Sequence, residues 1–308
     1  MRKFSAHLSA SQIDMFVSAT KLMRCFLEPV YNESLAKGPF LVTAAVTYAW
    51  NATECLLQQY QEVNELQVVK VLCDEIFGKK YDCSAIVAVS VPDGITTVTF
   101  NGSYPEQIGL EATKSVFVRQ WLNFSGEFVS DYFASAAQKL YNNGLKTAFA
   151  DIMGRHPKHE VRITGLSLGG ALATLFSDLI VTDGLADPTQ IRIITYGEPK
   201  VGNQLFSLNH VGRVGGYVFR LINRRDPIPL LPYALLDLLQ PYAEHQFEVR
   251  YPSGTDAGYV VCDGSIYCPP HPFPYPEFIL DNLMDHLTYF APPNKTIADF
   301  GAQNCHWQ

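Results

Sequence analysis

The chain has 308 residues, of which 47% are hydrophobic and 17% are charged, so it can bury one large core or two small ones. The net charge is −7 and Lys and Arg never occur more than two in a row, which excludes nucleic acid as an expected partner. No run of 18 uncharged apolar residues occurs, so we expect no membrane-spanning helix. Polar residues interrupt the apolar stretch after the opening Met-Arg-Lys, and no signal peptide can be recognised there.

The first half of the chain begins with a predicted helical region and then contains predicted strands and a long helix. Residues 1–80 are predicted to be mainly helical, because "LVTAAVTYAWNATECLLQQYQEV" (41–63) places apolar residues at helical spacing. The stretch "SAIVAVSVPDGITTVTFNGS" (84–103) predicts two strands joined by a Pro-Asp-Gly turn. An irregular stretch with apolar side chains follows. Residues 128–156 then predict a long helix that is broken near Asn142-Asn143-Gly144.

Strands and helices alternate through the rest of the chain. "HEVRIT" (159–164) predicts a strand, and "ALATLFSDLIVTDG" (171–184) predicts a helix that ends at glycine. Further strands are expected in 190–202 and 215–229, with edge strands in "HQFEVRY" and "GYVVCD". This alternation predicts an α/β fold with a mostly parallel central sheet flanked by helices. No linker or repeat divides the sequence, so we expect one domain.

A serine lies in the turn between the predicted strand and the long apolar helix. Gly165-Leu166-Ser167-Leu168-Gly169 matches the G-x-S-x-G pattern, and Gly170 follows it. In a nucleophile elbow the serine adopts a strained conformation, and glycines two residues before and after it avoid a clash. The N–H groups at the start of the helix then point to the place where negative charge develops. The alternative is a structural turn that uses small residues for packing.

A nucleophilic serine needs a base and an acid that orients the base. Asp226 follows the predicted strand "VFRLINRR" and precedes Pro227, so it is a candidate acid, although Asp before proline is also a common turn residue. Asp178 and Asp183 belong to the helix after the serine, where a solvated or capping role is expected. Four histidines follow Asp226, and from the residues alone the base stays open among them: His245, His271, His286 and His306.

The cysteines favour an oxidising compartment. The seven cysteines include two pairs that are close in sequence, Cys73/Cys83 and Cys262/Cys268. No pair of cysteines has the spacing of a zinc site, so we expect no metal. The sequence also has five N-x-S/T sequons, which favour a secreted glycoprotein. They begin at Asn32, Asn51, Asn101, Asn123 and Asn294.

Four blocks in order resemble the class 3 lipase family, the fungal-type triacylglycerol lipases that nematodes also carry. "VRITGLSLGGALATLFS" resembles the family's V-x-x-T-G-H-S-L-G-G-A-x-A block, and "ITYGEPKVGN" resembles Y-G-x-P-R-V-G-N. "RLINRRDPIPLLP" resembles the family's acid block, and "DHLTYF" resembles its histidine block. The resemblance runs from about residue 40 to residue 292, so we expect an N-terminal segment (1–39) followed by a single lipase-like domain (40–308).

The resemblance implies an α/β-hydrolase fold in which Ser167 is the nucleophile, Asp226 the orienting acid and His286 the base. It further implies that Ser103, in "FNGS", and Leu168 supply the oxyanion hole through their backbone N–H groups. Residues 104 to about 114 fall where relatives carry a lid. The family's disulfides suggest three pairs and leave Cys25 unpaired; the pairs are Cys55–Cys305, Cys73–Cys83 and Cys262–Cys268.

The sequence departs from the family at two positions. Leu166 replaces the histidine that precedes the serine, and Asn101 replaces the arginine of F-R-G-[ST], which we expect to loosen that strand end. We predict a secreted, monomeric serine hydrolase that cleaves lipid esters at a lipid–water interface without a cofactor. The alternatives are a phospholipase or other carboxylesterase on the same fold, and a lipid-binding relative that has lost catalysis.

Overall fold

The computed structural model describes residues 29–103, 118–120, 126–232, 242–244, 247–262 and 276–307. Contacts within the chain separate residues 1–31 from a main unit, residues 32–308, which holds every element named below. The predicted N-terminal segment lies mostly outside the described residues, and the prediction of a single domain over 40–308 stays a prediction. In the described part of the chain, no helix is both long and apolar enough to cross a membrane.

An eight-stranded sheet forms the centre of the main unit, in the order β1-β2-β3-β6-β7-β9-β11-β12. The five strands from β3 to β11 are parallel to one another, and antiparallel pairs flank them on both sides. The sequence-based prediction of a mostly parallel α/β sheet is therefore confirmed. The strands are β1 (Glu65–Ile76), β2 (Lys79–Ser90), β3 (Ile95–Phe100), β6 (Glu160–Leu166), β7 (Ile191–Tyr196), β9 (Val218–Asn223), β11 (Glu248–Tyr251) and β12 (Val260–Cys262).

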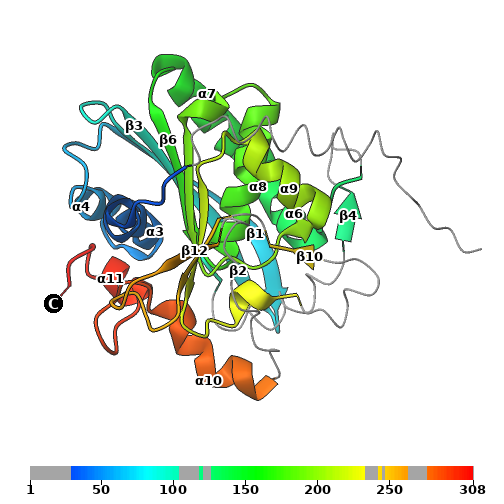
Figure 1. Ribbon diagram of the computed structural model, residues 1–308. Helices are drawn as coiled ribbons and strands as arrows, with labels where there is room; N and C mark the ends of the chain where they lie inside the picture. Colours follow the sequence, from blue (N-terminus) through cyan, green and yellow to red (C-terminus); the bar gives the residue numbers. More distant parts are fainter. Residues whose placement is uncertain are drawn as a thin grey trace, which may run out of the picture. The chain divides into compact units, whose positions relative to one another are not determined.

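Helices cover both faces of this sheet (Figure 1). One face carries α6 (Asp131–Leu140), α7 (Lys146–Arg155), α8 (Leu168–Thr182) and α9 (Gln204–Arg213); the other carries α3 (Leu41–Ala45), α4 (Ala52–Leu56) and α11 (Ile297–Ala302). Strands β3 and β9 are buried along their whole length, as expected for parallel strands between two helical layers. Helix α8 is buried on nearly every side, which agrees with its largely apolar sequence.

Shorter elements complete the main unit. A second sheet has the order β10-β8-β5-β4 and consists of β4 (Val118–Gln120), β5 (Phe128–Ser130), β8 (Gly202–Asn203) and β10 (Tyr242–Ala243). The remaining helical elements are α2 (Glu33–Leu35), η1 (Ala36–Phe40), η2 (Val46–Tyr48), η3 (Tyr141–Leu145), η4 (Pro188–Gln190), η5 (Ile228–Leu230) and α10 (Pro276–Leu287). The predicted break in the long helix is confirmed, because Asn143 and Gly144 have non-helical dihedrals between α6 and α7.

The prediction of helix through residue 80 is wrong after residue 64. Residues 65–76 form β1, which pairs with β2 along almost its whole length. Val68, Val69 and Val71 are β-branched and favour a strand, and the pairing with β2 satisfies the backbone that a helix would otherwise satisfy internally. The hairpin predicted around Pro92-Asp93-Gly94 is confirmed, because β2 and β3 pair antiparallel across that turn.

Two of the three implied disulfides are present in the structure. Cys55–Cys305 joins residues 250 positions apart and ties α4 to the C-terminal end of the chain, whereas Cys73–Cys83 closes the β1–β2 hairpin. Cys262 is also disulfide-bonded, but Cys268 lies outside the described residues, as does Cys25.

We expect the two disulfides to contribute unequally to stability. Changing Cys55 and Cys305 together to serine should lower the free energy of unfolding by about 5 kcal/mol, because a very long loop is released in the unfolded chain. The matched double change at Cys73 and Cys83 opens a short loop and should lose about 3 kcal/mol. Urea unfolding of both variants measures the difference. An equal loss, or a larger loss for the short loop, would contradict the expectation.

Candidate active site

The turn from β6 into α8 places Ser167 in an unusual backbone conformation. Ser167 has φ 59° and ψ −126° and is almost fully buried, and such a positive φ is strained for a residue other than glycine. Its N–H donates to the carbonyl of Tyr196 at 2.9 Å, and its own carbonyl accepts from the N–H of Gly170 at 2.9 Å. These bonds fix the serine between the end of β7 and the first turn of α8.

The two glycines of the turn are required by close backbone contacts. A Cβ on Gly165 would lie 2.3 Å from the carbonyl carbon of Gly169, and a Cβ on Gly169 would lie 2.3 Å from the carbonyl oxygen of Phe100. No side chain can occupy either position without moving backbone. The sequence pattern G-x-S-x-G therefore reflects the packing of α8 against β3 and β6.

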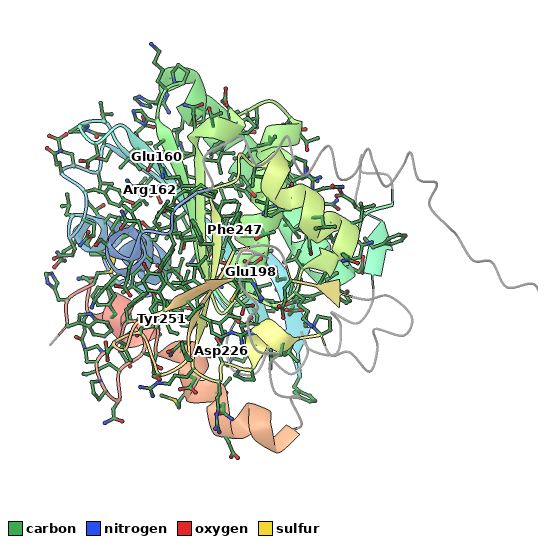
Figure 2. The ribbon with its side chains drawn as sticks, in the orientation of Figure 1. Glu160, Arg162, Glu198, Asp226, Phe247 and Tyr251 are labelled. Atoms are coloured by element: carbon green, nitrogen blue, oxygen red, sulfur yellow. A yellow bond between two sulfur atoms is a disulfide. The ribbon has the colours of Figure 1, made fainter. Side chains whose placement is uncertain are left out.

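A buried carboxylate and imidazole face each other at the ends of β9 and α10. His286 Nδ1 lies 3.0 Å from both carboxylate oxygens of Asp226, and both side chains are at most 1% exposed. The backbone N–H of Ile228 also donates to Asp226 Oδ1 at 2.9 Å. Asp226, labelled in Figure 2, lies three residues after the end of β9, as the sequence suggested, and the turn at Pro227 follows it.

Tyr289 is a third partner of this carboxylate, and sequence reasoning missed it. Its hydroxyl donates to Asp226 Oδ2 at 2.5 Å and accepts from the N–H of Asn223 at 3.2 Å. Burial, and then the negative charge of Asp226, raises the pKa of Tyr289 well above its ordinary value, so the hydroxyl keeps its proton. The signal was present in "DHLTYF", where Tyr289 stands three residues after His286.

The loop after β7 brings the serine and the Asp226–His286 pair together. Tyr196, which accepts from the Ser167 N–H, is followed by Gly197, whose φ is +56°. A Cβ on Gly197 would lie 2.6 Å from His286 Nδ1 and 2.7 Å from Asp226 Oδ2. The three residues thus gather around Tyr196-Gly197 at the carboxyl ends of β6, β7 and β9, where ligands bind in open α/β sheets.

The end of β3 lies against the same turn. A Cβ on Gly102 would lie 3.0 Å from the carbonyl oxygen of Leu166, and Ser103 comes next. The Asn101 amide accepts from the N–H of Ser84 at 2.6 Å and donates to the carbonyl of Asp82 at 3.2 Å. Asn101 is therefore buried and bonded to β2, and the expectation that it loosens this strand end is wrong. Leu166 is buried as well.

Comparisons with known proteins show which families this chain is similar to. Residues 97–236 match the family model described as lipase (class 3). The chain is 27% identical to lipase ZK262.3 of Caenorhabditis elegans, over 89% of this chain and 83% of that protein. It is 26% identical to a lipase of Rhizomucor miehei, over 86% of this chain and 68% of that protein. The chain is therefore similar to class 3 lipases, and its match with the family model covers residues 97–236.

Solved structures establish the fold. A triacylglycerol lipase whose catalytic centre is a serine protease triad superposes with a TM-score of 0.62 at 24% identity, covering 84% of this chain and 94% of that one. The Rhizomucor miehei triacylglyceride lipase gives a TM-score of 0.62 at 22% identity, covering 85% and 96%. The chain therefore has the α/β-hydrolase fold that the resemblance implied.

A buried arginine joins the two loops that hold the site. Arg220 in β9 is 1% exposed, and its Nη1 donates to the carbonyls of Glu198 and Pro229 at 3.1 and 3.3 Å. Its Nη2 donates to Glu248 at 2.7 Å. Glu198 follows Gly197, and Pro229 lies just after Asp226, so one guanidinium fixes both loops. Although burial alone would lower the pKa of Arg220, the carboxylates of Glu244, Glu248 and Glu198 raise it.

Glu198 connects this loop to the elbow helix. Its carboxylate is fully buried and accepts from Thr174 in α8 at 2.6 Å and from Thr195 in β7 at 2.5 Å. Its side chain also lies over Gly170, where an added Cβ would come within 2.9 Å of the Glu198 Cβ. Sequence reasoning missed Glu198 and Arg220, because their partners are distant in the chain.

The expectation for Asp178 is wrong, because this residue is neither solvated nor a cap. It is fully buried and contacts His210 at 2.9 Å and Arg213 at 2.5 Å. Asp183, at the C-terminal end of α8, accepts from Tyr141 at 2.7 Å and from Lys146 at 2.6 Å.

Among the remaining histidine candidates, His306 contacts Gln58 and lies near Glu54. His245 and His271 lie outside the described residues, as does the predicted lid over residues 104 to about 114.

Arg220 should be among the most sensitive positions for stability. Changing Arg220 to Met leaves Glu248 with a buried charge that has lost a partner, and should lower the free energy of unfolding by about 3–5 kcal/mol. Adding Glu248→Gln should recover part of this loss. Arg224→Met is the matched control, because Arg224 is half-exposed and 3.9 Å from Asp285, and should cost less than about 1 kcal/mol. Similar urea unfolding curves for both single variants would refute the assignment.

Proposed function

We propose that this protein is a serine hydrolase that cleaves carboxylic ester bonds of lipids through an acyl-enzyme. The observation that carries the proposal is the convergence of Ser167, at a strained elbow, with the buried Asp226–His286 pair around Tyr196-Gly197. The match of residues 97–236 with the class 3 lipase model and the α/β-hydrolase fold agree with it. The assignment of Ser167, His286 and Asp226 as nucleophile, base and orienting acid is part of the proposal.

The hydrogen bonds of His286 define the proton transfers. Because Nδ1 faces the Asp226 carboxylate, Nδ1 carries the proton and Nε2 is the basic nitrogen. Ser167 Oγ attacks the ester carbonyl while Nε2 takes its proton, and the same proton passes to the leaving alcohol. Water then attacks the acyl-enzyme with His286 as base, and serine is released. Tyr289 and the Ile228 N–H hold the Asp226 carboxylate in position throughout.

The charge that forms on the carbonyl oxygen needs donors near Ser167. Leu168 is the first residue of α8, and the first four N–H groups of a helix have no intrahelical acceptor. Its N–H and that of Ser103 are the donors we assign to the oxyanion hole. The packing of Gly102 against the Leu166 carbonyl supports this assignment, because it keeps Ser103 beside the elbow.

Lipid esters are the substrate class we propose, because the relatives are named lipases, among them secreted mono- and diacylglycerol lipase 1 of Fusarium solani. Secretion of this protein, its action at a lipid–water interface and a monomeric state belong to the proposal. The disulfides support secretion, since such bonds persist in oxidising compartments. Of the sequons, Asn32, Asn51 and Asn294 are exposed, whereas Asn101 is buried and bonded and cannot carry a glycan in the folded protein.

A fluorophosphonate probe tests the nucleophile. The wild-type protein should be labelled, and Ser167→Ala should abolish labelling and lower kcat for ester hydrolysis by roughly 10⁴-fold or more. Ser177→Ala is the matched control, because Ser177 is a buried serine of α8 that donates to the Thr174 carbonyl, and it should keep its labelling. Absence of labelling in the wild type would overturn the proposal. Parallel assays on emulsified triacylglycerol, phospholipid and dissolved short-chain esters separate a lipase from a phospholipase or another carboxylesterase.

Tyr289 gives a second test that does not remove a triad member. Tyr289→Phe deletes the hydroxyl that bonds Asp226 Oδ2, and should lower kcat/KM by roughly tenfold, because one hydrogen bond to a charged group is lost. Tyr251→Phe is the control, since the Tyr251 hydroxyl bonds Glu33 at 3.1 Å, away from Asp226. If Tyr289→Phe behaves like Tyr251→Phe in steady-state kinetics, the hydroxyl does not support the acid.

A further inference from the structure

The β1–β2 hairpin has its turn at the same end of the sheet as the candidate active site. Strand β1 is antiparallel to β2, β2 is antiparallel to β3, and β3 is parallel to β6. Strand β1 therefore runs in the same direction as β6, which ends at Ser167. The turn at Phe77-Gly78 lies at this end, and in Figure 1 the cyan hairpin points toward the end where α10 lies.

The hairpin continues beyond its neighbour in the sheet. Pairing of β2 with β3 ends at Ala85↔Phe100, whereas pairing of β2 with β1 continues to Ile76↔Lys79. At roughly 3.3 Å per residue, the ribbon extends about 20 Å past the end of β3. Ser103 lies just after that strand end, so the hairpin stands beside the oxyanion side of the site.

Covalent and polar contacts hold this extension in place. The disulfide Cys73–Cys83 joins its two strands. Next to it, the pairing register shifts between Leu72 and Asp74, and the Asp74 carboxylate is buried and bonded by the hydroxyl of Tyr132 in α6. Crosslinking both strands and anchoring one of them to a helix fixes the direction in which the turn points.

The turn exposes an aromatic side chain completely. Phe77 has a relative exposure of 105% and a φ of +50°, so a bulky apolar residue occupies a conformation that favours glycine. Full exposure in water is unfavourable for a phenyl ring. The charges next to it balance, because Glu75 stands opposite Lys80 across the two strands and Lys79 is offset by Asp82.

We propose that the tip of the β1–β2 hairpin inserts Phe77 into the surface of a lipid aggregate and so presents the active-site end of the sheet to it. This inference rests on the proposed function, since a lipid ester substrate lies in such a surface. Because the charges at the tip balance, the lipid surface that we propose is neutral or zwitterionic. The attraction to this surface comes from burial of the phenyl ring. The disulfide-linked hairpin fixes the orientation of the protein relative to the lipid surface.

The binding test uses the full chain with Ser167→Ala, so that no substrate is consumed, and vesicles of phosphatidylcholine. Adding Phe77→Ala should lower the partition coefficient in co-sedimentation by about tenfold, the effect of removing one inserted phenyl ring. Adding salt should change the binding of the parent little, and phosphatidylserine should not strengthen it, because the tip has no excess charge.

A control variant with the phenylalanine at another position distinguishes insertion at the active-site end of the sheet from nonspecific binding through any exposed phenyl ring. Val91 is partly exposed in the turn between β2 and β3, at the opposite end of the sheet. Adding Val91→Phe to Phe77→Ala returns a phenylalanine to the surface but at the wrong end, and should not restore binding. Restored binding would overturn the inference, as would absence of binding by the parent, no effect of Phe77→Ala, or binding that salt abolishes.

Kinetics with Ser167 intact distinguish this inference from the proposed function. Phe77→Ala should keep the wild-type kcat/KM on a dissolved short-chain ester but lose about tenfold in rate on an emulsified ester at limiting surface. Equal rates on the emulsion would overturn the role of Phe77 and leave the proposed function standing. No hydrolysis of any ester by the wild type would overturn the proposed function itself.

Discussion

The close contact of α8 with β3 and β6 is the constraint on which the site depends. Gly165 and Gly169 touch through their backbones, and Gly169 also touches the carbonyl of Phe100. Because the helix begins against two strands, the residue between the glycines must turn sharply and adopts φ 59°. The surrounding structure sustains this strain because most of α8 is buried and closely packed.

Asp226 lies in the loop after β9, and Asp226 and His286 both pack against the loop that contains Gly197, so the positions of these loops need support of their own. Gly197 leaves no room beside Asp226 and His286, so any movement of its loop would displace both side chains. Arg220 prevents such movement by donating to carbonyls on both loops, and Glu198 extends the connection to α8. The elbow and the Asp226–His286 pair are therefore joined through buried polar groups as well as through the sheet.

Local sequence signals were sufficient to predict the parallel sheet, the elbow and the position of Asp226. β-branched runs predicted the strands, spaced glycines predicted the elbow, and an acid before proline predicted the position of Asp226. They failed where distant partners decide the outcome. Residues 65–76 form a strand because β2 pairs with them, and Asp178 is buried because His210 and Arg213 reach it from α9. The choice of His286 came only from a family resemblance, and Tyr289 and Arg220 were not identified because their roles depend on packing across the sheet.

The disulfide between Cys55 and Cys305 has a topological consequence. It converts the chain from α4 to the residues after α11 into a covalent ring that contains the whole sheet. A protease that cuts one surface loop within this ring opens it without releasing a fragment. All the strands and the loops that carry Ser167, Asp226 and His286 remain parts of one molecule. A single cleavage within this ring is then a change of connectivity rather than a loss of parts.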